Sequence, residues 1–369
     1  MKIAIFNWRD IRNPKAGGAE LYFHEMAKRW IKSENEVTWI SAGWKGCKKN
    51  EEIDGINIYR TGNEFSVYIY AAFKFFSKAK DADVIIDVEN GIPFFTPIYA
   101  GNKKVLHIHH IHKDVWFREA GKNLFMNILA GIGYSLENWL MPFVYRKNKV
   151  VTLSKSSARE ILNGKYSRYN PEIINPGVEF YEYKKVGKNR RPIVLYLNRI
   201  KKYKGVKVLV DAARELYSRN NKIDFWIAGA GDDLNEMIKY AKQYKINNVK
   251  FLGRVSEEKK AELMQKAWIF ANPSSKEGWG IVNVEANYFG TPVIGSDVHG
   301  IRDSVLDGKT GLLFKEGNYK ELADKIEYLV KNNKERTRMG KEGMKWARKY
   351  GWDKVASEYL NILHKTAAN

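Results

Sequence analysis

Two glutamates, Glu277 and Glu285, stand eight positions apart, separated by the run Gly-Trp-Gly-Ile-Val-Asn-Val. The first lies in a glycine-rich segment and the second in the opening turns of a helical pattern. A helix N-terminus offers unpaired N–H groups and partial positive charge, so it suits a diphosphate. Ionised carboxylates only accept hydrogen bonds, so they suit the hydroxyl groups of a ribose and a sugar ring. Together these features indicate a nucleotide-sugar site.

Further motifs follow one another along the chain. They are Gly17-Gly18-Ala19-Glu20, the histidine-rich run His107 to His112, Asn198-Arg199-Ile200 with Lys204-Gly205, and Asp307-Gly308-Lys309-Thr310-Gly311. With the Glu-x7-Glu pair, this series resembles family 4 of the retaining glycosyltransferases of the GT-B fold. The resemblance covers nearly the whole chain and is strongest in its C-terminal half. It implies transfer of a hexose or N-acetylhexosamine from a nucleoside-diphosphate sugar to a lipid-linked or cell-surface glycan precursor, with no metal or other cofactor.

Arg199 and Lys204 are the cations expected at the leaving group. A departing nucleoside diphosphate develops negative charge, which a guanidinium and an ammonium stabilise. The alternative is two surface charges in a basic loop. The family usually has Gly before the Arg, and here the residue is Asn198.

The resemblance also implies the remaining donor contacts. Glu285 would bond the ribose hydroxyls and Glu277 a hydroxyl of the donor sugar, although Glu285 could also be an acid that only complements the helix dipole. The predicted donor-binding residues are Gly17, Gly18, Arg199, Lys204, Arg254, Val255, Glu277, Gly278, Trp279, Gly280, Ile281 and Glu285. The predicted catalytic residues are His110, Arg199, Lys204 and Glu277.

Four of the seven histidines, His107, His109, His110 and His112, end one predicted strand. A metal cluster is one interpretation. Against it, strand alternation places odd and even positions on opposite faces, and no cysteine or carboxylate tetrad completes a site in the sequence. The family has a histidine here near the donor sugar. His110 is the predicted residue, with His109 and His112 as alternates and a packing histidine as the other interpretation.

Two other glycine-rich segments follow predicted strands. Gly17-Gly18 precedes a predicted helix and could let the backbone approach an anionic ligand, or could be an ordinary flexible loop. Gly229-Ala230-Gly231-Asp232 resembles a phosphate loop, although such a segment often only makes a tight turn between a strand and a helix.

Short apolar runs alternate with longer helical patterns, which predicts an α/β protein with mostly parallel sheets. Expected strands are 3–6, 37–41, 84–87, 105–108, 150–153, 193–197, 225–228, 249–252, 269–271 and 293–294. Expected helices are 18–32, 65–80, 123–146, 155–163, 205–219, 233–244, 257–266, 281–289, 319–332 and 340–364. Residues 164–192 are the linker candidate.

The expected architecture is therefore GT-B, with two Rossmann-like doubly wound domains facing a cleft. The N-terminal acceptor domain would span 1–178 and the nucleotide-sugar domain 179–345. The segment 346–369 would form a helix that returns to the first domain, as the resemblance implies. Most of the motifs follow a predicted strand, where ligands bind in such folds.

The net charge of +21 attracts polyanions, although a generally basic composition would give the same value. No RNA-binding signature or zinc finger is present, so nucleic acid is not the expected partner. Cys47 is the single cysteine, which fits a reducing cytoplasm. Neither a signal peptide nor a run of about 18 uncharged apolar residues occurs, so a spanning helix is not expected.

Aromatic and basic residues are interleaved at 65–78, 116–118, 124–126 and 139–147. Such segments suit the headgroup region of an anionic membrane. The alternative is ordinary core helices of an α/β domain. The hypothesis is a cytoplasmic protein on the inner face of the cell membrane.

Other functions are open to the same sequence. A nucleotide-sugar epimerase of this fold would need no acceptor, a phosphorylase would need a much longer chain, and a non-catalytic basic scaffold would bind membranes or polyanions. No positioned carboxylate pair acts as nucleophile and acid, unlike a retaining hydrolase. The family is thought to use front-face displacement, and the resemblance implies it here.

Overall fold

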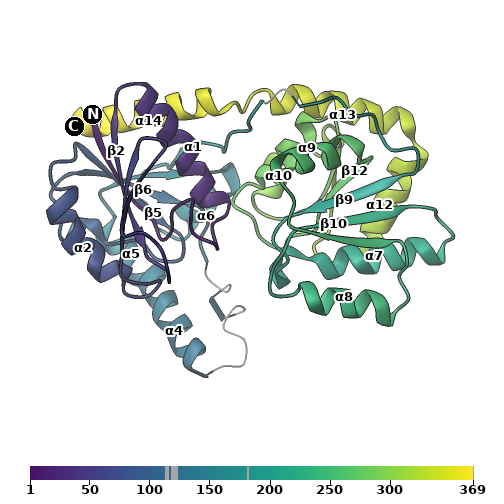
Figure 1. Cartoon of the computed structure of the whole chain (residues 1–369), viewed down its shortest axis with the longest axis horizontal. Coiled ribbons are helices and arrows are strands. Elements are labelled where there is room, and N and C mark those ends of the chain that lie inside the picture. The colour runs from purple at the N-terminus through teal and green to yellow at the C-terminus, as the bar shows by residue number, and fades with distance from the viewer. Residues whose placement is uncertain (113–115, 118–123, 181–182, 369) are drawn as a thin grey trace. The chain divides into compact units, whose positions relative to one another are not determined.

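The computed structural model describes residues 1–112, 116–117, 124–180 and 183–368, and it divides into two compact units. The first unit contains Met1–Gly177 and the C-terminal segment from Trp352, and the second contains Val178–Gly351. Each unit is a twisted sheet with helices packed on it (Figure 1).

The first unit is built on an eight-stranded sheet in the order β3-β4-β2-β1-β5-β6-β7-β8. Its strands are β1 Lys2–Phe6, β2 Glu36–Ala42, β3 Asn50–Ile53, β4 Ile56–Thr61, β5 Val84–Glu89, β6 Lys103–Ile108, β7 Lys149–Thr152 and β8 Glu172–Ile173. All neighbouring strands are parallel except β3 and β4, which form an antiparallel hairpin. The predicted parallel strands are confirmed. The hairpin and β8 were missed because they lie at the two ends of the sheet and lack long apolar runs.

The helices of the first unit are α1 Gly18–Lys32, α2 Val67–Lys78, η1 Thr96–Ile98, α4 Leu124–Ser135, the π-helical turn η2 Leu136–Leu140, α5 Met141–Val144, α6 Lys155–Asn163 and α14 Trp352–Ala368. The predicted helix 123–146 is thus interrupted by a π turn, and its first residue lies outside the described residues. The C-terminal helix packs on the first unit as expected. Trp30 Nε1 of α1 donates to the Ala356 carbonyl at 2.9 Å, and the Tyr359 ring lies against the Trp30 ring.

The second unit has a six-stranded parallel sheet in the order β11-β10-β9-β12-β13-β14. Its strands are β9 Ile193–Leu197, β10 Asp224–Ala228, β11 Val249–Gly253, β12 Ile269–Asn272, β13 Val293–Ser296 and β14 Gly311–Phe314. Its helices are η3 Lys202–Lys204, α7 Val206–Ser218, α8 Leu234–Gln243, α9 Glu257–Lys266, α10 Ile281–Tyr288, α11 Ile301–Ser304, α12 Tyr319–Lys331 and α13 Asn333–Ala347. Every predicted strand and helix before 340 in this unit is present. The short elements β14, η3 and α11 were not predicted.

The predicted single helix 340–364 is wrong, because two helices, α13 and α14, occupy this part of the chain. The glycines of α13 let it pack closely on the end of α10, where a Cβ on Gly340 would lie 2.4 Å from the Gly290 carbonyl oxygen. The second unit therefore ends at Gly351, rather than at 345. At its other end, the Val178 N–H donates to the Tyr350 carbonyl, so this unit begins at 178.

Both sheets reverse their strand order once. The reversal lies between β1 and β5 in the first unit and between β9 and β12 in the second. In open parallel sheets, ligands bind at the carboxyl ends of the strands beside such a reversal. We therefore expect functional sites at the carboxyl ends of β1 and β5 in the first unit and of β9 and β12 in the second.

Candidate active site

Polar side chains converge on Glu277 at the strand reversal of the second unit. Lys204 Nζ lies 2.6 Å from Glu277 Oε1, Asn198 Nδ2 donates to the same oxygen at 3.3 Å, and the Ser274 hydroxyl lies 3.0 Å from it. Asn198 follows β9 and Ser274 follows β12, so the reversal itself brings them together. The site is thus a fixed carboxylate ringed by hydrogen-bond donors.

Lys204 is not a surface charge, because only 6% of the residue is exposed. Its position depends on Gly205, which has φ +70° and packs so closely on β12 that a Cβ would lie 2.1 Å from the Pro273 carbonyl oxygen. The Glu277 side chain, which is 12% exposed, compensates an ammonium charge that would otherwise be costly to desolvate. The sequence pattern identified both residues but not their pairing.

Arg199 is exposed, and its backbone is fixed at both ends of the residue. Its N–H donates to Asn198 Oδ1 at 2.8 Å, and its carbonyl accepts from the Tyr196 hydroxyl at 2.9 Å. Asn198, where the family usually has Gly, therefore anchors both Glu277 and the backbone of Arg199. The guanidinium is left on a rigid base at the strand end, as a cation for an anionic ligand requires.

Glu285 lies in the second turn of α10, which starts after Gly280 with φ +84°. Its Oε1 accepts from Lys260 Nζ at 2.8 Å, a partner that the sequence did not indicate. The Trp279 side chain is buried and its ring packs on Tyr350, with centroids 5.3 Å apart. The contacts predicted for Gly278, Trp279, Gly280 and Ile281 therefore concern their backbone N–H groups.

Arg254 and Val255 come directly after β11, with Arg254 exposed and Val255 half-buried. Gly253 before them has φ +66°, which turns the chain at the end of the strand. Their predicted role in binding the donor stays a prediction.

The glycines of Gly229-Ala230-Gly231 have a packing role. A Cβ on Gly229 would lie 1.9 Å from the Asn198 carbonyl oxygen, and one on Gly231 would lie 2.2 Å from the Ile200 carbonyl oxygen. The Ile200 N–H also donates to the Ala230 carbonyl at 3.0 Å. This segment is a tight turn that packs against the Asn198–Ile200 loop. Since this packing already requires both glycines, they are not evidence for a phosphate loop.

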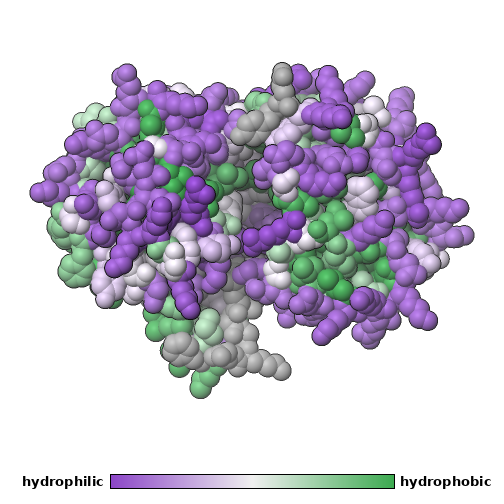
Figure 2. Space-filling view, in the orientation of Figure 1, coloured by the Kyte–Doolittle hydropathy of each residue, from purple (hydrophilic) through white to green (hydrophobic). Residues whose placement is uncertain are grey.

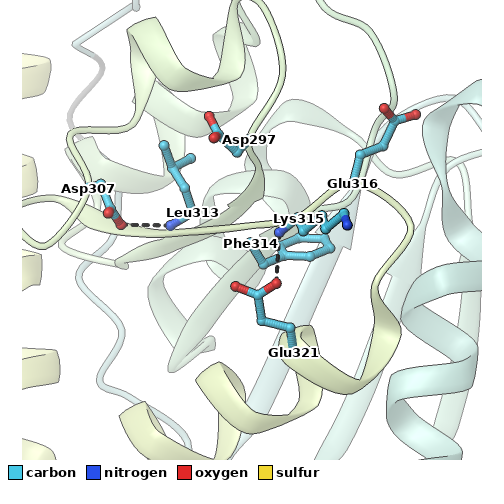
Figure 3. Close-up of a pocket in the computed structure, with 7 residues that line it drawn as sticks. All are labelled: Asp297, Asp307, Leu313, Phe314, Lys315, Glu316 and Glu321. Atoms are coloured by element: carbon cyan, nitrogen blue, oxygen red, sulfur yellow. Dashed lines mark hydrogen bonds between the residues drawn. The ribbon is translucent and has the colours of Figure 1, made fainter.

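A separate pocket at β13 and β14 is acidic. It is lined by Asp297, Asp307, Leu313, Phe314, Lys315, Glu316 and Glu321 (Figure 3). Asp307 and Glu321 accept from the backbone N–H groups of Leu313 and Lys315 at 2.8 and 3.0 Å. Four carboxylates against one lysine repel a diphosphate, so this pocket is not the donor site.

In the first unit, the segment before α1 is ordered by a buried ion pair. Arg60 Nε and Nη2 donate to the two oxygens of Asp10 at 2.7 and 2.8 Å, and both side chains are almost fully buried. The Gly17 N–H donates to Glu20 Oε2 at 2.7 Å, which caps α1. The Gly17-Gly18 junction is therefore a defined helix start rather than an unstructured loop.

His107 and His109 belong to the core of the first unit. His107 Nδ1 lies 3.2 Å from the Tyr359 hydroxyl, and both rings pack against Tyr22 and Phe23. Burial, reinforced by His112, lowers the pKa of His109 to about 3, and burial with His109 nearby lowers the pKa of His107 as well. Burial therefore favours the neutral form of both rings, and the assignment of His109 as an alternate site residue stays a prediction.

His110 and His112 lie beyond the end of β6, half-buried, with their rings stacked at 4.4 Å. Two buried carboxylates that the sequence did not single out surround this segment. Glu137 accepts from the His112 N–H at 2.5 Å and from Trp116 Nε1 at 3.0 Å, while Glu89 Oε1 lies 3.5 Å from His112 Nδ1.

One potential metal-ligand atom from each of Glu89, His112 and Glu137 lies within 4.8 Å of the other two. The sequence argument, that no cysteine or carboxylate tetrad completes a metal site, did not single out these two buried carboxylates, and the absence of a metal stays a prediction. The hydrogen bonds of Glu137 fix the chain that carries His110, which explains how this predicted catalytic residue is held in place.

The aromatic segments of the first unit bury one face in the core, where Phe75, Met141 and Tyr145 lie, but they leave many other large apolar side chains exposed. Trp139 and Leu124 are 77% exposed and Phe73 is 69% exposed. We call this set the apolar surface: Phe65, Ile69, Tyr70, Phe73 and Phe76 around α2, with Leu124, Met126, Ile128, Ile132, Trp139, Leu140 and Phe143 of α4, η2 and α5. Figure 1 shows α4 projecting from its unit, and Figure 2 shows hydrophobic residues on it.

Basic side chains border the apolar surface. Arg146 lies 5.1 Å from the centroid of the Phe143 ring, and Lys74 and Lys78 belong to the same helix, α2, as Phe73 and Phe76. Across the described residues, no helix has the length and apolarity needed to cross a bilayer.

The fold and the site define a class, that of the GT-B glycosyltransferases, with two Rossmann-like units and polar residues at the strand reversals. Two family models match consecutive parts of the chain. Glycosyltransferase Family 4 matches residues 16–180, and Glycosyl transferases group 1 matches residues 179–346. The chain belongs to family 4 of the GT-B glycosyltransferases and is a glycosyltransferase.

Known proteins of several activities resemble the chain. The phosphatidyl-myo-inositol mannosyltransferase of Mycobacterium leprae is 32% identical over 58% of this chain, which spans about half, 55%, of that relative. Among solved structures, sucrose-phosphate synthase from Thermosynechococcus elongatus has a TM-score of 0.83 at 18% identity, covering 100% of this chain and 99% of that one. Anabaena Alr3699/HepE, in complex with UDP-glucose, has a TM-score of 0.77 at 17% identity, covering 99% and 100%.

Proposed function

We propose that this glycosyltransferase moves a hexose or N-acetylhexosamine, with retention, from a nucleoside-diphosphate sugar to a lipid-linked or cell-surface glycan precursor. The single observation that carries the donor assignment is the Lys204–Glu277 pair at the strand reversal, with exposed Arg199 beside it. The structurally similar Anabaena Alr3699/HepE was solved in complex with UDP-glucose, which favours a UDP-sugar as the donor. The similarity to a mannosyltransferase makes GDP-mannose the second donor to test.

Each group has a proposed role in that reaction. Arg199 and Lys204 stabilise the charge that develops on the departing diphosphate, with the N-terminus of α10 adding its dipole. Glu277 orients the donor sugar and Glu285 accepts from the ribose hydroxyls. His110 is the proposed catalytic residue of the first unit. The cations take the role that a metal would otherwise have, so we propose that the reaction needs none.

The test is a thermal-shift screen of UDP, GDP and ADP, followed by transfer assays with the matching sugars in the presence of EDTA. A nucleotide at 100 times its Kd adds about 2.7 kcal/mol to the stability of the folded state. One nucleotide should stabilise the wild type and not Arg199→Ala. Release of the sugar only as a new glycoside supports transfer, whereas isomerisation of the nucleotide sugar without an acceptor would indicate an epimerase. If no nucleotide binds, the donor assignment fails.

We further propose that the apolar surface rests on an anionic membrane, where a lipid-linked acceptor is found. Exposed Trp and Phe side chains with neighbouring Arg and Lys fit the boundary between headgroups and acyl chains. This many exposed large apolar side chains, on a protein without a spanning helix among its described residues, favours a partner that covers them. The excess of +21 charges adds attraction to anionic lipid.

Liposome sedimentation tests this part. The wild type should sediment with vesicles that contain phosphatidylglycerol and stay in the supernatant with purely zwitterionic vesicles. Leu124→Ser combined with Trp139→Ser should lose most of this binding. Tyr217→Ser, which removes a 52% exposed aromatic residue of the second unit, is the control and should bind normally. Equal binding of the two variants would refute the proposed surface.

A further inference from the structure

We infer that Lys260 is a positioning residue of the donor site, which holds Glu285 as a fixed acceptor for the ribose hydroxyls of the nucleotide sugar. The inference rests on the proposed function, in which Glu285 binds ribose. It adds a residue that the Glu-x7-Glu pattern does not contain.

Lys260 joins two helices through its ammonium group. Its Nζ lies 2.8 Å from Glu285 Oε1 on α10 and 2.5 Å from Glu257 Oε2 on α9. The side chains of Lys260 and Glu285 are only 15% and 14% exposed. Lys260, Glu257 and Glu285 line one small pocket together with Val178, Glu179, Tyr183, Ala261 and Phe289. The contact is therefore part of a shaped recess next to the residue that is proposed to read the ribose.

Lys260 keeps its proton and its positive charge. Burial disfavours the ammonium form, but the negative charges of Glu285 and Glu257 outweigh it and raise the pKa of Lys260. A charge-assisted hydrogen bond of this length is stronger than a neutral one and fixes the direction of the carboxylate. Without the ammonium, the largely buried Glu285 carboxylate would face the exposed Glu257 carboxylate with no cation between them, and Glu285 would turn away.

The bond leaves Glu285 able to accept from a ligand. A carboxylate has about four lone-pair sites, and Lys260 uses one of them. The remaining sites suffice for the two vicinal hydroxyl groups of a ribose. Preorganising an acceptor in this way improves binding because the side chain is already ordered when the ligand arrives.

The other lysines of α9 differ from Lys260. Lys259 and Lys266 both pair with Glu262 on the same helix, and the Lys259 side chain is 49% exposed. Exposed pairs within one helix contribute little to stability. Lys259, the immediate neighbour of Lys260, is therefore the matched control for the same change of side chain.

The experiment compares Lys260→Met with Lys259→Met by calorimetric titration and steady-state kinetics, using the nucleotide sugar that stabilises the wild type and its 2′-deoxyribose analogue. In Lys260→Met, the Kd and KM for the ribose donor should rise about tenfold, the expected effect of one lost charge-assisted bond, while kcat changes less than about twofold. The preference for the ribose donor over the 2′-deoxy analogue should shrink. Lys260→Arg should restore most of the affinity, and Lys259→Met should match the wild type.

Each outcome decides a different point. Unchanged affinity and ribose preference in Lys260→Met, with normal binding in the wild type, would overturn the role of Lys260 and leave the proposed function intact. A wild type that binds no nucleoside-diphosphate sugar would overturn both. If Lys260→Met unfolds, Lys260→Gln gives the same affinity comparison, because glutamine is an uncharged polar side chain that also lacks the ammonium group.

Discussion

Replacing Lys204 by Met removes one member of a buried ion pair, and its consequences follow from the burial of both partners. The Lys204 and Glu277 side chains are 7% and 12% exposed, and Nζ lies 2.6 Å from Oε1. Removing one partner of a buried pair costs about 3–5 kcal/mol because the other charge stays desolvated. Since both side chains keep some contact with water, we expect a loss near the lower end, about 3 kcal/mol.

The same variant should lose catalysis for a separate reason. Removing one preorganised donor at a site of developing negative charge lowers kcat by about 10²–10³-fold. Arg199→Met should lose activity to a similar extent, but its free energy of unfolding should change by less than about 0.5 kcal/mol because the side chain is exposed. The pair of variants thus separates the catalytic effect from the structural one.

Thermal unfolding and a transfer assay measure the stability and the activity side by side. For a domain of about 150–250 residues, each 1 kcal/mol shifts Tm by about 2–4 °C, so Lys204→Met should melt roughly 6–12 °C lower. The double variant Lys204→Met with Glu277→Gln should regain part of the stability and none of the activity. If Lys204→Met is as stable as the wild type, the pairing is unimportant for folding. If Arg199→Met keeps full activity, the proposed donor site is wrong.

Three further variants test the structural framework. Burial, and repulsion from Arg336, lower the pKa of Lys188 to about 7, so between about pH 7 and 10.4 the unfolded chain binds more protons and stability rises with pH. In Lys188→Met this rise should be missing, which urea midpoints at pH 6.5 and 9 would show. Gly229→Ala places a Cβ 1.9 Å from the Asn198 carbonyl oxygen at φ +137°, so we expect a loss of about 3 kcal/mol or more together with weakened donor binding. Arg60→Met leaves buried Asp10 unpaired and should cost about 3–5 kcal/mol in thermal unfolding, whereas adding Asp10→Asn should recover part of it.

The sequence determined the class of fold and suggested the chemistry of the proposed donor site. Apolar runs of two to five residues between helical patterns predicted most of the parallel strands, because burial on both faces leaves a local signature. The Glu277/Glu285 spacing and the basic loop at Arg199 and Lys204 came from the same local information. Their common place at strand ends followed from the rule for parallel sheets.

Only the tertiary structure decided which residues are partners and which faces stay exposed. Lys204 meets Glu277 and Lys260 meets Glu285 because separate strands and helices bring them together, and nothing in their local sequence records it. The same holds for Glu89 and Glu137, which flank the segment that carries His110 and His112.

The aromatic helices show most clearly that a sequence pattern does not determine burial. The apolar pattern of α2 or α4 predicts that one face of the helix is removed from water, but it does not predict which element covers that face. The chain covers His107 and His109 with α1 and α14, while it leaves Phe73 and Trp139 exposed. Periodicity is a local property of the sequence, whereas burial depends on which distant elements arrive, and that is set by the packing of the whole unit.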